Sequence, residues 1–151
     1  MLKVKWINLH SVCDDRGCLT AIEGSKAVPF EIRRIFYLHN VTLGADRGGH
    51  AHLDTDQFAI AVNGSLNIVV SDGIEARSLV LDTPSWGISL PRMTWTKLID
   101  FSENAVCLVL ANTHYDRSKS LRTWADYLTH RGLQQSPEIK SGPVLSRTIN
   151  P

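Results

Sequence analysis

Cysteine is scarce in this sequence, which contains Cys13, Cys18 and Cys107. Because the number is odd and the spacing matches no metal-binding or redox motif, we expect reduced thiols rather than a disulfide framework. Long apolar runs are also missing, and Met1 to His10 alternates apolar and polar residues instead of forming the apolar stretch of a signal peptide. These features predict a soluble protein of the cytoplasm.

The sequence also lacks an excess of charge of either sign. It carries 16 Lys and Arg against 15 Asp and Glu among 151 residues. No global field therefore attracts nucleic acid or an anionic membrane, and any bound anion has to be held locally. The length suits one domain, which we place at residues 1–133, followed by an irregular C-terminal tail at residues 134–151.

Short β-type segments separated by turn residues dominate the sequence. The clearest are residues 35–37, 58–62, 66–70 and 106–110. Asn63-Gly64 and Asp72-Gly73 suit tight hairpins, so we predict a meander of three strands that ends at residues 75–81. Many short strands at this spacing predict an all-β barrel or jelly roll rather than a parallel α/β sheet.

One short amphipathic helix is expected near the C-terminal end. Its apolar stripe comprises Leu121, Trp124, Ala125 and Leu128. Ser120 suits its N-cap and Gly132 its C-terminal stop.

Strand parity suggests a cavity. Gln57, Ala59 and Ala61 share the small, partly polar face of one predicted strand, as a cavity wall requires. The opposite face carries large apolar side chains, which must be covered by a second sheet or by another subunit. The strand at residues 106–110 is apolar on both faces, and for so small a chain a homodimer is the economical explanation.

The segment from Gly44 to Gly64 fits the first cupin motif, with Gln57 where the motif normally has a glutamate. His50 and His52 are two apart, so in a strand they project on the same face. Metal-binding cupins take a further histidine from a second motif, but the matching residues 91–96 contain none. Two imidazoles and an amide form a poor divalent-metal site, and we expect no metal and no other cofactor.

The sequence resembles the sugar nucleotide 3,4-ketoisomerase family, the WxcM-like, metal-free cupins, over residues 15–128. The resemblance rests on residues 34–37, 47–52, 57, 63–65, 71–73, 91–95 and 107–111. It implies a homodimeric cupin jelly roll (double-stranded β-helix) with one C-terminal helix. The implied reaction moves the keto group of dTDP-4-keto-6-deoxyglucose from carbon 4 to carbon 3 through an enediol, in the synthesis of cell-surface deoxyamino sugars.

The resemblance also implies roles for individual residues. His50 is expected to carry the proton, because histidine titrates near neutrality, and His52 to assist at a sugar oxygen, although the order could be reversed. Tyr37 is the third catalytic candidate, the alternative being a core tyrosine.

Five residues are candidates for substrate binding. Arg47 suits the diphosphate or the sugar, and Gln57 shares the histidine face. Arg33 is preferred to Arg34 because, in a regular strand, Arg33 and Tyr37 point to the same face. Trp95 could stack on sugar or base, although a core position is commoner for tryptophan, and Arg16 lies in a loop that is close to substrate in the family.

Three alternatives stay open. A cupin sugar nucleotide epimerase uses similar residues with a different proton relay, and a metal-dependent cupin is disfavoured by Gln57. A sugar-binding cupin without catalysis would need no proton carrier at all.

Overall fold

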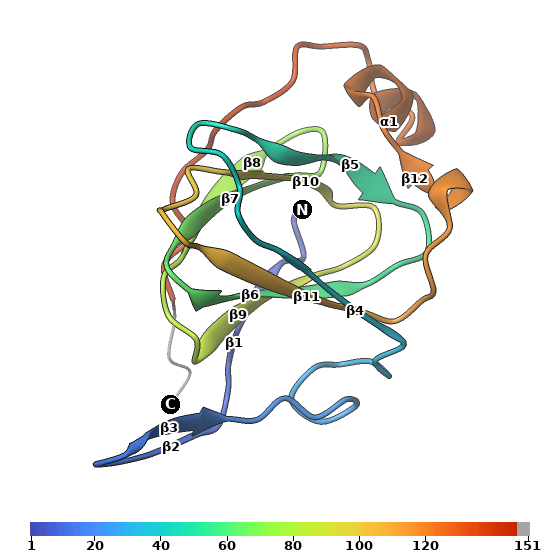
Figure 1. Cartoon of the computed structure of the whole chain (residues 1–151). Coiled ribbons are helices and arrows are strands. Elements are labelled where there is room, and N and C mark those ends of the chain that lie inside the picture. Colours follow the sequence, from blue (N-terminus) through green and yellow to red (C-terminus); the bar gives the residue numbers. More distant parts are fainter. Residues whose placement is uncertain (148–151) are drawn as a thin grey trace.

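Two antiparallel five-stranded sheets face each other in the computed structural model, which describes residues 1–147 (Figure 1). The first sheet has the order β1 (Lys5–Asn8), β9 (Trp86–Leu90), β6 (Gln57–Asn63), β11 (Val106–Ala111) and β4 (Arg34–Leu38). The second has the order β12 (Ser120–Leu121), β5 (Arg47–His52), β10 (Trp95–Ile99), β7 (Leu66–Ser71) and β8 (Ala76–Leu81). This arrangement confirms the predicted cupin jelly roll.

The predicted three-stranded meander is wrong at its first turn. Asp72-Gly73 does join the paired strands β7 and β8, but β6 and β7 lie in different sheets. Asn63-Gly64 therefore turns a corner between the sheets instead of closing a hairpin. Gly64 has φ 65°, and a Cβ there would lie 2.9 Å from the Cα of Ala105, so the corner requires glycine.

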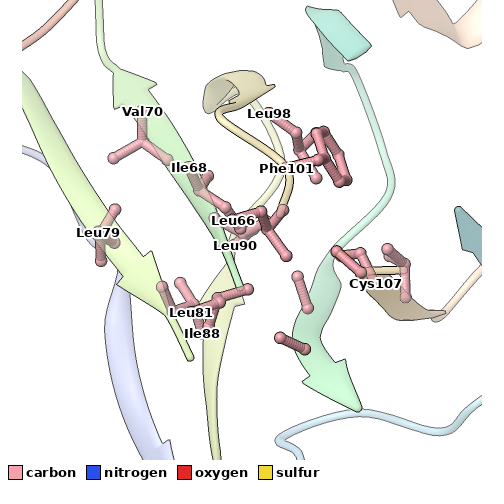
Figure 2. Close-up of a cluster of buried hydrophobic side chains, with 14 of the residues drawn as sticks. Leu66, Ile68, Val70, Leu79, Leu81, Ile88, Leu90, Leu98, Phe101 and Cys107 are labelled. Carbon is pink, nitrogen blue, oxygen red and sulfur yellow. The ribbon is translucent and has the colours of Figure 1, made fainter. Parts of the chain in front are cut away.

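The main hydrophobic core fills the space between the two sheets. Figure 2 shows Leu66, Ile68 and Val70 of β7 and Leu79 and Leu81 of β8 in one cluster with Ile88 and Leu90 of β9. Each fully buried aliphatic side chain of this kind contributes about 1.5–3 kcal/mol. Ala59 and Val109, which belong to the same core, also line one of the cavities described below.

The outer face of the first sheet is covered by the chain's own N-terminal segment. Phe58 and Ile60 of β6 pack with Leu9, Val28 and Phe30, all of them buried. The prediction that a second sheet or another subunit covers this face is therefore wrong. Burial of this face alone no longer calls for a dimer.

A small hairpin projects from the barrel (Figure 1). It consists of β2 (Ser11–Asp14) and β3 (Gly17–Thr20), and Cys13 and Cys18 lie opposite each other in its register. The two cysteines form a disulfide, whereas Cys107 is free and buried. The expectation of three reduced thiols is therefore wrong. The spacing gave no sign of this pairing, because hairpin register, not a motif, brings the two sulfurs together.

The predicted helix is α1 (Trp124–His130), preceded by a 3₁₀ turn, Arg117–Lys119. Its N-cap is Thr123, not Ser120, which belongs to β12; the Thr123 hydroxyl accepts a hydrogen bond from the Asp126 amide at 3.1 Å. Gly132 has φ 67° and ends the helix as predicted. No helix within residues 1–147 is long and apolar enough to cross a membrane.

Residues 134–147 form no helix or strand but pack along the barrel. Residues 148–151 of the predicted tail lie outside the described residues. Three tryptophan side chains donate indole N–H hydrogen bonds to residues 134–147. Trp124 donates to the Ser136 carbonyl at 2.8 Å, Trp95 to the Glu138 carboxylate at 3.0 Å and Trp6 to the Leu145 carbonyl at 3.0 Å.

Candidate active site

A β-bulge in β5 sets the direction in which His50 and His52 point. Gly48 and Gly49 both have positive φ, 80° and 74°, and the pairing with β10 shifts register between Thr96 and Lys97. A Cβ at Gly48 would lie 2.8 Å from the Thr96 carbonyl oxygen, so only glycine allows this close approach. The residues before the histidines thus shape the strand that presents them.

His50 and His52 lie together, with ring centroids 4.9 Å apart and the rings nearly perpendicular. They border two cavities. One, of about 250 Å³, enters the barrel and is lined by residues that include Arg47, Gln57, Thr96 and the core side chains Leu90 and Leu98. The other, of about 330 Å³, is lined by Arg34, Phe36, Tyr115 and Arg122 in addition to the histidines.

The two imidazoles differ in their hydrogen bonds. The Gln57 side-chain nitrogen lies 3.2 Å from His52 Nε2, and the Ser120 hydroxyl lies 3.3 Å from His52 Nδ1. An amide N–H donates to Nε2, so the proton of a neutral His52 sits on Nδ1 and is donated to Ser120. Within residues 1–147 no side chain hydrogen-bonds the His50 ring. Its hydrogen bond is to the Gly48 backbone, which leaves one ring nitrogen to exchange a proton with a ligand.

Both histidines are neutral at pH 7. Burial lowers the pKa of His52 from 6.5 to about 4, with His50, Arg34 and Arg122 adding to the effect. Burial also lowers the pKa of His50, although the Gly48 backbone partly offsets it. No Asp or Glu of residues 1–147 lines either cavity, and the Asp54 carboxylate, outside both, raises the pKa of His52 only enough to offset part of this lowering.

The structure brings part of the predicted set together. His50, His52, Gln57 and Arg47 line the barrel cavity. Tyr37 contributes to the rim of that cavity, but its side chain is 60% exposed and its ring lies 5.3 Å from that of His39. Its catalytic role stays a prediction.

Three of the predicted substrate-binding residues lie elsewhere. In β4 the side chains of Arg34, Phe36 and Leu38 point inward, so Arg33 is exposed and forms an ion pair with Glu31. Both faces of this strand carry apolar residues, so the alternation of side chains did not reveal which face is buried. Trp95 is buried under α1, against Trp124 and Tyr127, and lines neither cavity.

Arg16 also lies outside both cavities. It sits at the tip of the projecting β2–β3 hairpin, where it is exposed and pairs with Asp14. It therefore does not contact the site of its own chain.

Sequence reasoning missed four residues of the second cavity: Arg34, Phe36, Tyr115 and Arg122. Arg34 and Phe36 could have been found by choosing the other face of β4 as the one that points into the barrel. Tyr115 and Arg122 lie in the segment between β11 and α1, where no periodicity marks a direction and only the fold brings them to the histidines.

The donor set near the histidines is poor for a metal. Residues 1–147 contain no group of three or more His, Cys, Asp or Glu side chains placed to hold a metal ion. Gln57 stands beside His52 as a neutral amide, which is a weak ligand for a divalent ion.

Comparison with known proteins assigns the chain to a family. Residues 2–132 match the model of the WxcM-like, C-terminal family. The chain belongs to this family. A curated relative, the TDP-4-oxo-6-deoxy-alpha-D-glucose-3,4-oxoisomerase of Aneurinibacillus thermoaerophilus, is 34% identical over 123 residues, which is 82% of this chain and 88% of that protein.

Solved structures extend the comparison. A 3,4-ketoisomerase from Helicobacter canadensis is 33% identical, with a TM-score of 0.85 over 87% of this chain and 99% of that one. The 3,4-ketoisomerase QdtA of Thermoanaerobacterium thermosaccharolyticum was solved as a histidine-to-asparagine variant in complex with TDP-4-keto-6-deoxyglucose. It is 33% identical, with a TM-score of 0.85 over 87% of this chain and 96% of that one.

Proposed function

We propose that this WxcM-like protein is a 3,4-ketoisomerase of TDP-linked sugars that converts TDP-4-keto-6-deoxyglucose into its 3-keto isomer. The observation that carries the proposal is the neutral pair His50 and His52 in a cavity without carboxylates, in a chain 34% identical to a TDP-4-oxo-6-deoxyglucose 3,4-oxoisomerase. The reaction moves hydrogens and needs no oxidant, in keeping with a site made of acid–base groups.

The proposed reaction passes through an enediol intermediate, with two proton transfers that form it and two that consume it. A base removes the proton from carbon 3, which lies next to the ketone, while the carbonyl oxygen at carbon 4 takes up a proton. The resulting enediol then loses the proton of the carbon 3 hydroxyl and gains one at carbon 4. The sum leaves the formula unchanged and the ketone at carbon 3.

The hydrogen bonds favour His50 as the proton carrier. His52 is held at both nitrogens, by Gln57 and by Ser120, whereas the His50 ring has no side-chain partner within the described residues. We assign His50 to the carbon-bound protons. We assign His52, with Gln57, to the sugar oxygens.

We also propose a homodimer. Ile35 and Tyr37 of the edge strand β4 are each 60% exposed, and the paired hairpin residues Val12 and Leu19 are 57% and 65% exposed. Among residues 1–147, the hairpin makes no extensive contact with any other strand or helix. A second copy would cover these apolar side chains, and Tyr37 is part of the cavity rim, so the interface would reach the site.

Light scattering with size-exclusion chromatography tests the dimer. Ile35→Glu is expected to shift the mass toward one chain, because it puts a charge in the interface. Ile74→Glu is the matched control, since Ile74 is 70% exposed at the turn between β7 and β8. A wild-type mass of one chain contradicts the dimer.

We place the reaction in the cytoplasm, following the sequence prediction. The Cys13–Cys18 disulfide is unusual for a reducing compartment, because thiols there normally keep such pairs reduced.

Proton NMR of TDP-4-keto-6-deoxyglucose in deuterated water tests the function. Deuterium at carbon 4 together with a new 3-keto product is the expected result. Deuterium at carbon 3 or 5 with the ketone still at carbon 4 would instead indicate an epimerase, and unchanged substrate a binding protein. His50→Asn is expected to abolish turnover, whereas His130→Asn, at the exposed end of α1, is the control.

A further inference from the structure

Strand β8 is an edge strand of the second sheet. Its pairing with β7 runs without a register shift, and on its other side every second residue turns its backbone N–H and C=O away from the sheet. Proteins usually protect such an edge with proline, a bulge or charged side chains, above all lysine. Residues 76–81 contain no proline, glycine or lysine, and Arg77 is their one charged residue. The strand itself therefore carries little protection against pairing with another chain.

Residues 142–147, here called the strap, lie along this edge (Figure 1). Ser78 donates its backbone N–H to the Pro143 carbonyl at 3.0 Å, and its own carbonyl accepts from the Leu145 amide at 2.9 Å. These two hydrogen bonds make a parallel bridge between Ser78 and Val144. The strap therefore takes the place that a further strand would take beside β8.

The end of the strap also links the edge strands of the two sheets. Arg147 donates to the Val80 carbonyl at 3.2 Å and forms an ion pair with Asp82, just after β8. The guanidinium carbon of Arg147 lies 5.1 Å from the ring centroid of Trp6, which belongs to β1. Leu145 packs against the main hydrophobic core. Main-chain, ionic and apolar contacts thus hold the strap in place.

The close approach of the strap to β8 requires glycine at its first position. A Cβ at Gly142 would collide with the Ala76 carbonyl oxygen and would lie 2.9 Å from the Arg77 backbone nitrogen. Both are main-chain atoms of a paired strand and have little room to move. A larger residue at position 142 would therefore push the strap away from β8.

We propose that the strap keeps the β8 edge from pairing with the β8 edge of a second copy of this chain. Two identical antiparallel strands are related by a two-fold axis, so the same edge on two copies can pair with itself. The strap lies beyond residues 2–132, which match the family, and none of residues 142–147 lines either cavity. Its role is therefore separate from the proposed reaction.

Deletion of residues 142–151 tests the proposal, because it removes the strap and keeps the acceptors of the Trp95 and Trp124 indoles. Light scattering with size-exclusion chromatography is expected to give a mass about twice that of the wild type as the protein concentration rises. Gly142→Leu should have the same effect in the full-length chain. Val144→Ser is the matched control, since the Val144 side chain is 65% exposed and its backbone bridge is kept.

Val80→Lys distinguishes edge pairing from a folding defect. Val80 is 38% exposed on the outer face of β8, so a lysine there places a charge on the edge and leaves the core intact. Added to the deletion, it is expected to restore the wild-type mass. Ile35→Glu should leave the new association unchanged, because Ile35 lies in β4, at the edge of the other sheet.

Hydrogen exchange supplies a second measurement. In the dilute deletion variant, the amides of residues 76–81 should exchange about 10-fold faster or more than in the wild type, and they should regain protection as the concentration rises. A wild-type mass at every concentration in both strap variants would overturn the proposal. Association that Val80→Lys does not reverse, or that Ile35→Glu abolishes, would overturn it equally.

Discussion

Replacing Gln57 by glutamate puts a carboxylate where the structure has a neutral amide, 3.2 Å from His52 Nε2. At that separation an ion pair is worth about 5 kcal/mol in an effective dielectric of about 20. The cost of burying the carboxylate offsets part of this gain. We therefore expect Gln57→Glu to raise the pKa of His52 by about 1–3, from about 4 to between about 5 and 7.

The same change alters the acid stability of the protein. In the wild type the folded-state pKa of His52 lies below the unfolded value, so its contribution is fully present above pH 6.5 and is lost as the pH falls toward 4. The difference between 6.5 and about 4 corresponds to about 3 kcal/mol, which partial exposure of the ring reduces to about 2 kcal/mol. In Gln57→Glu this acid-induced loss is expected to shrink.

The assay is an NMR titration of the histidine rings, combined with urea unfolding at pH 7 and pH 5. A chelator is present, because two histidines and a glutamate form a metal-binding set. Gln135→Glu makes the same chemical change near the end of α1 and should not move the His52 titration. A pKa of His52 that stays near 4 in Gln57→Glu would refute this account of the site.

Four further predictions concern other parts of the molecule. If His50 is the base, as proposed, kcat/KM should stay flat from pH 8 down to 6.5 and fall only below it, because the pKa of His50 is lowered; a fall that begins above pH 7 would contradict this. Gly64→Ala should lower the free energy of unfolding by about 1–3 kcal/mol, measured in urea, because the new methyl meets Ala105 at a left-handed φ. Unreduced protein should give no thiol reaction with Ellman's reagent until it unfolds, since burial raises the pKa of Cys107 to about 12; fast labelling of one thiol would show this to be wrong. Truncation after Leu133 should lower Tm by several degrees, because it removes the acceptors of three indole N–H groups; an unchanged Tm would mean that the C-terminal segment does not stabilise the barrel.

Much of the site could be predicted because its chemistry is local in sequence. His50 and His52 share one face by strand parity alone, and Gln57 faces the same cavity because it shares one face of β6 with the small residues Ala59 and Ala61. The jelly roll followed from many short strands, and Gly132 ended the helix where its left-handed φ was needed.

Other predictions failed where the sequence pattern was compatible with two structures, either in the buried face of a strand or in the type of turn. Both faces of β4 are apolar, so the sequence could not decide whether Arg33 or Arg34 faces inward, and packing of Phe36 and Leu38 against the core decided for Arg34. Asn63-Gly64 suits a hairpin equally well as a corner between sheets.

The sequence by itself determined the class of fold, the histidine pair and the reaction expected from it, because these depend on residue type and on spacing within single strands. Tertiary structure decided which residues join the pair from afar. It brought Arg34, Tyr115 and Arg122 to the histidines, buried Trp95 under α1 and placed Cys13 opposite Cys18. Such contacts depend on which face of an edge strand packs inward and on the paths of loops without periodicity, and these are set by packing of the whole barrel rather than by local pattern.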